Sequence, residues 1–216
     1  MRVIVVGAGG HGQVVADILL SVRRQGLDVI PIGYVDDDPA LSGREFLGLP
    51  VIGGTERLRE VVHDAVIVAI GDNSRRRVVF SALEQQGKRF AIARHPSAVI
   101  AAGVTIGPGT AICAGAIVNP GTIIGSNVIL NTGCSIDHHN HVGDHVHVGP
   151  GVHTGGDVTI GSGSLVGIGA TVMPGRTIGA NCIVGAASLV LRDADEGTVV
   201  AGVPARRIQR HAVLQP

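Results

Sequence analysis

The chain has very few aromatic residues. It contains no Trp, one Tyr and three Phe among 216 residues. These residues all precede position 91, and they are Tyr34, Phe46, Phe80 and Phe90. The rest of the chain must therefore build its core from aliphatic side chains. This asymmetry indicates two regions with different kinds of core.

Charge is also scarce beyond the last aromatic residue. Between positions 97 and 191 the only charged residues are Asp137, Asp144, Asp157 and Arg176. Over the whole chain Lys plus Arg equals Asp plus Glu at 17 each, so the net charge is zero with His neutral. The composition gives no sign of a nucleic-acid or membrane-surface partner.

Long apolar runs and cysteines are few as well. The chain begins with a short strand-like run, and neither a longer apolar stretch nor an export cleavage site follows it. This predicts a cytoplasmic protein without a membrane span. The three cysteines are Cys113, Cys134 and Cys182, and we expect free, reduced thiols.

The second half of the chain repeats with a period of six. Stepping by six from Ile106 to Val190, fourteen of fifteen positions are Ile, Leu or Val, and the exception is Thr154. Apolar residues make up only 45% of the chain, so chance does not explain this run. Gly follows nine of the fifteen positions, where a Cβ would clash at a corner. The pattern predicts a parallel β-helix in which three hexads close one triangular coil, about five coils in all.

The first part of the chain is typical of a small α/β unit. We expect strands over residues 2–6, 29–35 and 65–70, and helices over 13–22, 57–62 and 75–86. A proline at position 96 marks the boundary. The expected organisation is a small Rossmann-like α/β domain at 1–94, a hexapeptide-repeat β-helix at 95–200 and a C-terminal tail at 201–216.

A glycine-rich turn follows the first expected strand. Gly7, Gly9 and Gly12 match the fingerprint that lets backbone approach phosphates at a helix N-terminus. About 90 residues hold only one mononucleotide-binding half, so a nucleotide-linked ligand other than NAD fits better. The alternative is a turn that only packs helix on strand. Candidate ligand contacts at the turn and strand ends are Gly9, Gly10, His11, Asp36, Asp37, Asp72 and Asn73.

Six of the ten histidines fall between positions 136 and 153. The hexad register places His141, His147 and His153 outside the prism and His138 just past a corner. Three uses are open at this point. One histidine could act as a general base, with Asp137 and His139 as its sequence neighbours. Several could converge on a metal ion, or they could line a subunit interface.

Several motifs together resemble a known family over nearly the whole chain. They are Gly-Ala-Gly-Gly-His-Gly at 7–12, Asp36-Asp37, Ile-Gly-Asp-Asn at 70–73, His-Pro-Ser at 95–97, the hexads with Ile-Asp-His at 136–138, and Ala-Gly-Val-Pro-Ala at 201–205. The chain resembles the sialic-acid O-acetyltransferase-like group, which includes N-acetyltransferases of UDP-, GDP- or dTDP-linked amino-deoxysugars. The resemblance implies a homotrimer of left-handed β-helices. It also implies acetyl-CoA as co-substrate in a groove between neighbouring subunits, and no required metal.

The resemblance also assigns roles to individual residues. The catalytic base of the family follows an acidic residue in the coil, which here gives His138 after Asp137. The family usually has Asp or Glu directly after that histidine, and this chain has His139. His11 matches a histidine that contacts the sugar. The residues expected around acetyl-CoA are His147 near the acetyl group, Gly156 as oxyanion donor, Ile168 and Ala186 along the pantetheine arm, and Val203 and Pro204 at its far end.

The expected reaction is direct transfer of acetyl from acetyl-CoA to the amino group of a nucleotide-linked amino-deoxysugar in polysaccharide biosynthesis. O-acetylation of sialic acid or another sugar hydroxyl is the nearest alternative. A metal-dependent hydratase of the γ-carbonic-anhydrase kind is a second alternative, although the N-terminal nucleotide module argues against it. Thr154 lies on the same wall as Ile136, one coil further, so we expect relaxed packing near the acetyl group.

Overall fold

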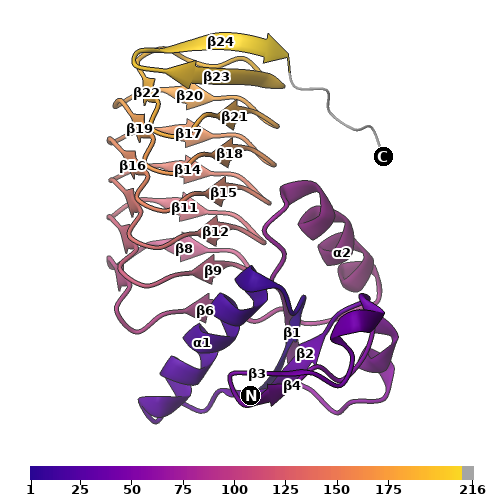
Figure 1. Ribbon diagram of the computed structural model, residues 1–216. Coiled ribbons are helices and arrows are strands. Elements are labelled where there is room, and N and C mark those ends of the chain that lie inside the picture. Colours follow the sequence, from indigo (N-terminus) through magenta and orange to yellow (C-terminus); the bar gives the residue numbers. More distant parts are fainter. Residues whose placement is uncertain (211–216) are drawn as a thin grey trace.

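The computed structural model describes residues 1–210, so the last six residues of the expected tail lie outside the described part. The chain forms a small α/β domain beside one end of a long β-prism (Figure 1). The expected fold class, an α/β domain followed by a parallel β-helix, is confirmed.

The N-terminal domain is built on a three-stranded parallel sheet. Its strands are β1 (Arg2–Val6), β2 (Ile30–Val35) and β5 (Ala65–Val68), in the order β2-β1-β5. The two helices are α1 (Gly10–Arg24) and α2 (Asn73–Gln85), and a short hairpin joins β3 (Glu45–Phe46) to β4 (Leu49–Pro50). Apart from the exposed Arg2, β1 and β5 consist of buried Val, Ile and Ala, as expected for strands covered on both faces.

One expected helix is only partly present. Residues 57–62 do not form an α-helix; the segment instead holds a 3-10 helix, η2 (Thr55–Arg59), and a shorter one, η1 (Pro39–Leu41), lies earlier. Leu58 is the only buried residue of η2, so the segment has no apolar stripe along which a longer helix could pack.

Two-residue strands recur every six residues and form three walls. The β13 wall contains β7 (Val99–Ile100), β10 (Ile117–Val118), β13 (Ser135–Ile136), β16 (His153–Thr154), β19 (Thr171–Val172) and β22 (Leu189–Val190). The β14 wall contains β8 (Thr105–Ile106), β11 (Ile123–Ile124), β14 (His141–Val142), β17 (Thr159–Ile160) and β20 (Thr177–Ile178). The β15 wall contains β6 (Ala93–Arg94), β9 (Ala111–Ile112), β12 (Ile129–Leu130), β15 (His147–Val148), β18 (Leu165–Val166) and β21 (Ile183–Val184).

The second residue of each strand points into the prism. Every hexad position from Ile112 to Val190 is buried, and together they form one aliphatic core. The three cysteines are buried and free. The period of six therefore predicted the core side chains correctly.

Two positions in each hexad make the corners possible. The glycine after the inward residue stacks closely on the next coil, since a Cβ at Gly107 would lie 2.5 Å from the backbone of Gly125. A second position, three residues after the inward one, has positive φ throughout, as at Gly109 (φ +75). This second position is not evident from the hydrophobic repeat. His139 (φ 56) and His145 (φ 60) occupy it, in a region that favours Gly, Asn, Asp and His.

Thr154 has a specific partner. Its Oγ1 accepts a hydrogen bond from the backbone N–H of Asp137 at 3.2 Å, and the side chain is only 7% exposed. Elsewhere on this wall the corresponding N–H bonds a strand carbonyl, as Asn119 does with Ile136. The Thr154 hydroxyl therefore takes over a ladder hydrogen bond, and the expected relaxation of packing there stays a prediction.

Arg76 fastens the N-terminal domain to the prism. Its guanidinium is buried, and it donates to the carbonyl oxygens of Asn127 and His145 on the prism and of Ile70 and Gly71 on its own domain. Asn73 adds bonds from its amide to the carbonyl oxygens of Gly163 and Ser164 at 3.0 Å each. These contacts hold α2 along the corner between the β14 and β15 walls. The division of the chain near residue 95 stays a prediction.

A hairpin closes the far end of the prism. β23 (Thr198–Gly202) pairs with β21 and with β24 (Ala205–Arg210), and both strands lie across the top coil (Figure 1). Val203 and Pro204 form the exposed turn of this hairpin. Within residues 1–210 no helix is long and apolar enough to cross a membrane.

Candidate functional site

The glycine-rich turn leaves open space at the start of α1. Gly9 is the N-cap of α1 and has no side-chain cap, and a Cβ at Gly9 or Gly10 would meet nothing within 4 Å. Gly7 (φ +106) sets the turn, and at Gly12 a Cβ would collide with the carbonyl of Gly7. Unpaired N–H groups at an open helix N-terminus suit a phosphate.

The acidic residues expected near the ligand support the loops around this turn. Asp36 accepts from the N–H of Ala8 at 2.7 Å, and Asp37 accepts from the N–H of Thr55 at 2.7 Å. Asp72 caps α2 through the N–H of Arg75 at 2.8 Å. Asn73 holds α2 on the prism, and its Oδ1 also accepts from Arg76. Their roles in ligand binding stay predictions.

His11 and His147 meet where the N-terminal domain covers the β15 wall. Their ring centroids are 6.4 Å apart. The ring of His147 is held at both nitrogens, by the Nδ2 of Asn131 at 3.1 Å and by the carbonyl of Gly71 at 3.3 Å. Nε2 of His11 is buried and has no partner among residues 1–210. A buried polar atom without a hydrogen-bond partner is uncommon in a folded protein and marks this nitrogen as a candidate ligand contact.

Both of these imidazoles are kept neutral. Burial, then His147 and Arg76, lowers the pKa of His11 from 6.5 to about 4. Burial, then Arg76, lowers the pKa of His147 from 6.5 to about 4. At neutral pH the pair therefore offers hydrogen-bonding nitrogens without positive charge.

These pKa values predict that acid destabilises the fold. Because the folded-state pKa of each histidine is below its unfolded value, the unfolded chain binds more protons as the pH falls from 6.5 to about 4. The free energy of unfolding should therefore fall across that window. Urea titrations at pH 7 and pH 5 measure the loss, and it should shrink in the double variant His11→Asn, His147→Asn but not in His63→Asn. An equal loss in all three proteins would contradict this assignment.

A second cluster surrounds His138 at the corner between the β13 and β14 walls. The exposed imidazole of His138 lies over the backbone of Gly156 on the next coil, where a Cβ would come within 2.5 Å of its Nε2. The N–H of Gly156 has no hydrogen-bond partner among residues 1–210. An imidazole therefore lies beside a free backbone donor, which is the pairing that acyl transfer requires.

The sequence neighbours of His138 play different parts. Asp137 does not hold the ring: its Oδ1 accepts from Asn119 Nδ2 and from the backbone N–H of His138, both at 2.8 Å. The hydrogen bond from Asn119, then that from His138, lowers the pKa of Asp137. His139 contacts the ring directly, with the two Nδ1 atoms 3.0 Å apart. Sequence reasoning missed Asn119, although it stands one coil before Asp137.

The two clusters lie on opposite sides of one prism. His138 stands at the corner between the β13 and β14 walls, whereas His147 projects from the β15 wall, which is the side of the triangle facing that corner. Ile168 and Ala186 are exposed on a further corner, between the β15 and β13 walls. A single chain therefore cannot bring His11 and His147 to its own His138.

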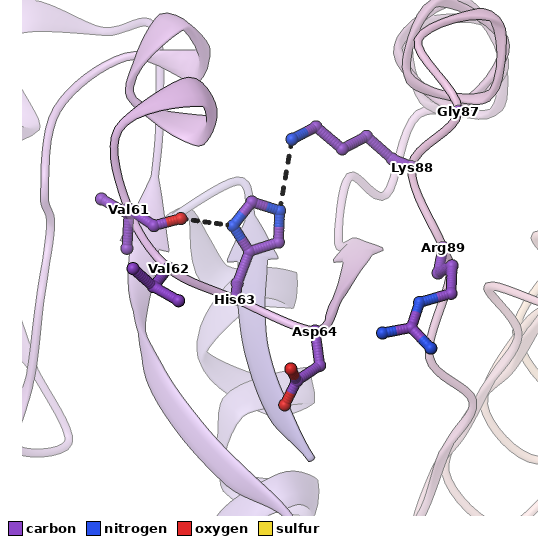
Figure 2. A pocket seen from close by; sticks show the side chains of 7 residues that line it. All are labelled: Val61, Val62, His63, Asp64, Gly87, Lys88 and Arg89. Atoms are coloured by element: carbon purple, nitrogen blue, oxygen red, sulfur yellow. Dashed lines mark hydrogen bonds between the residues drawn. The ribbon is translucent and has the colours of Figure 1, made fainter.

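A hollow on the N-terminal domain lies away from both clusters. It is lined by residues 61–64 and 87–89, at the edge of the sheet where β5 begins (Figure 2). Its polar groups bond one another: His63 Nδ1 lies 2.7 Å from the carbonyl of Val61, and Lys88 Nζ lies 3.4 Å from His63 Nε2. Ligands of parallel sheets bind at the other edge, where the strands end.

Comparison with known proteins decides the family. Residues 2–83 match the PglD N-terminal domain, and residues 157–192 match the bacterial transferase hexapeptide repeat. PerB from Caulobacter crescentus, in complex with CoA and GDP-perosamine, is 38% identical with a TM-score of 0.87, over 96% of this chain and 97% of that chain. The acetyltransferase domain of PglB from Neisseria gonorrhoeae, in complex with acetyl coenzyme A, is 32% identical with a TM-score of 0.88, over 96% and 98%.

The chain belongs to the sugar-nucleotide N-acetyltransferase family. It is an acetyl-CoA-dependent sugar-nucleotide acetyltransferase with a left-handed β-helix. A probable polysaccharide biosynthesis protein of Bacillus subtilis, EpsC, is 37% identical over 73 residues, which is 32% of this chain but only 12% of EpsC. This membership leaves the hydratase alternative without support.

Proposed function

We propose that this sugar-nucleotide acetyltransferase transfers acetyl from acetyl-CoA to the amino group of a nucleotide-linked amino-deoxysugar. The observation that carries the proposal is the position of the His138 ring over the backbone of Gly156, whose N–H has no partner among residues 1–210. PerB, which matches nearly the whole chain, was crystallised with CoA and GDP-perosamine. EpsC supports a place in polysaccharide biosynthesis.

The reaction proceeds by direct attack. The nitrogen of the sugar amine forms a bond to the thioester carbonyl carbon. At the same time, Nε2 of His138 takes a proton from that amine. The N–H of Gly156 stabilises the negative charge on the carbonyl oxygen. The carbon–sulfur bond then breaks, and the proton on His138 passes to the departing CoA thiolate.

An acyl-enzyme route through a cysteine is disfavoured. Cys134 and Cys182 lie in the prism core and Cys113 lies in the core of the N-terminal domain, and burial raises the pKa of Cys113 to about 11 and that of Cys134 to about 12. A buried neutral thiol is a weak nucleophile. Direct transfer is therefore the simpler mechanism.

The proposed active site lies between two chains. The nucleotide sugar binds to the N-terminal domain of one chain, near Gly9, His11 and His147, and a neighbouring chain supplies His138 and Gly156. Three copies around an axis repeat this contact three times, so we propose a homotrimer. Acetyl-CoA follows the groove between neighbours past Ile168 and Ala186 toward Val203 and Pro204.

The substrate class is tested with matched sugar nucleotides. GDP-, UDP- and dTDP-linked amino sugars and their hydroxy counterparts are each incubated with acetyl-CoA, and CoA release is measured. One amino sugar nucleotide should be acetylated at least about 100-fold faster than its hydroxy counterpart, since a neutral amine is the better nucleophile. Faster acetylation of the hydroxy compound would favour the O-acetyltransferase alternative. Thermal shifts with the same panel identify the nucleotide.

A further inference from the structure

The histidine pair at the proposed active site raises a question of tautomers. With the two Nδ1 atoms of His138 and His139 3.0 Å apart, one must donate and the other accept. If His138 Nδ1 carries the proton, its Nε2 has a free lone pair and can act as a base. If His139 donates instead, Nε2 of His138 carries the proton and cannot. The direction of this hydrogen bond therefore decides whether His138 is active.

A carboxylate on the next coil lies close to the pair. Asp157 stacks above His139 in the same hexad position, and both have positive φ, 57° and 56°. One carboxylate oxygen of Asp157 and one ring nitrogen of each histidine all lie within 4.8 Å of one another. The turn one coil below carries Asn119, Pro120 and Gly121, so no charge approaches from that side.

Asp137 and Asp157 are the charged groups that face the pair, and they act differently. Asp137 is the closer in sequence, but its Oδ1 is engaged by Asn119 and the backbone. The backbone N–H of Asp157 donates to the carbonyl of His138, but its carboxylate takes no hydrogen bond or ion pair among residues 1–210. It is the free negative charge beside the imidazoles.

We propose that His139 and Asp157 are positioning residues for His138. His139 Nδ1 accepts a hydrogen bond from Nδ1–H of His138, which leaves Nε2 of His138 free to take the amine proton. Asp157 balances the positive charge that then appears on the pair, since an opposite charge within several ångströms favours the charged form. This inference rests on the proposed function for its kinetic consequences, but the tautomer is a property of the protein alone.

The tautomer is read by ¹⁵N NMR of histidine-labelled protein at pH 8, without substrate. In the wild type, the Nδ1 and Nε2 signals of His138 should indicate the Nδ1–H form. In His139→Ala they should shift toward the Nε2–H form. Unchanged signals would overturn the proposal. If His139→Ala fails to fold, His139→Asp provides a second test, because Asp suits the positive φ. In this variant His138 should keep the Nδ1–H form.

The role of Asp157 is read from kinetics. Asp157→Asn fits the backbone because Asn127 and Asn181 occupy the same hexad position with positive φ. We expect kcat to fall about 10-fold, with the acidic limb of the pH profile displaced and KM for both substrates unchanged. In the His139→Asp background, Asp157→Asn should have little further effect, since a carboxylate then contacts His138 directly. A full additional loss there, or an unchanged pH profile in the single variant, would refute the role of Asp157.

Different results would refute the proposed function and the positioning roles of His139 and Asp157. A wild-type protein that acetylates no sugar amine would remove the proposed function, and the NMR result on His138 would still stand or fall by itself. Active wild type with an unchanged tautomer in His139→Ala would remove only the positioning roles.

Discussion

Replacing His138 with alanine is expected to lower kcat by about 1,000-fold, because a positioned general base contributes roughly 10²–10⁴ to a rate. The side chain is exposed and makes no contact with the prism core, so the fold should survive. Within residues 1–210 its ring bonds only the neighbouring His139. KM for acetyl-CoA should change little, since the variant removes a group that acts on the proton. Steady-state kinetics with the preferred amino sugar nucleotide measure the effect.

The matched control is His63→Ala, at the far edge of the N-terminal sheet (Figure 2). It should retain nearly wild-type kcat. If His138→Ala loses less than about 10-fold, the assignment of the base is wrong. A loss of kcat together with a lower melting temperature would point to a damaged fold instead. The variant His138→Asn would then separate loss of the base from loss of stability.

Gly156→Ala should produce the second largest loss. The added Cβ would overlap the imidazole of His138, which must move away. Ala180 and Ala186 occupy the same hexad position on other corners, so the backbone accepts a Cβ there. We expect kcat to fall about 100-fold, a loss of the size seen when transition-state groups are misplaced. The N–H of residue 156 remains, so the loss would report displacement of the base.

Ser162→Ala provides the control for Gly156→Ala. It changes the same hexad position on the next corner, away from His138, and should leave kcat close to the wild-type value. A crystal structure of Gly156→Ala should show the His138 ring rotated away from residue 156. Full activity with an undisturbed ring would mean that His138 does not need this position.

The sequence predicted most of the prism and part of the candidate site. The spacing from Ile112 to Val190 fixes which residues face inward, because a flat wall of stacked strands admits only one register. The same register placed His138 outside and past a corner. The register also implies that His138 and His147 stand on opposite sides of the prism, since nine residues are half of one coil.

Other features depend on contacts between distant segments. Arg76 looks like a solvent-exposed residue in a run of three arginines, yet it is buried between α2 and the prism. No local pattern shows that the N-terminal domain packs on the β15 wall and thereby lowers the pKa of His147. The part played by Asp157 beside His139 likewise requires the stacking of two coils.

The two-chain active site is tested most directly by mixing two inactive variants. His138→Ala removes the base. Gly9→Asp keeps a favourable N-cap for α1 but places a negative charge where the phosphates would bind. Each variant alone should be nearly inactive. In trimers assembled from equal amounts of both, about a quarter of the sites combine an intact His138 with an intact loop from the neighbour.

Activity near one quarter of the wild-type value, appearing only after the subunits are allowed to exchange, is the predicted result. If trimers shown by native mass spectrometry to contain both variants remain as inactive as each variant alone, His138 and the nucleotide loop do not meet across two chains.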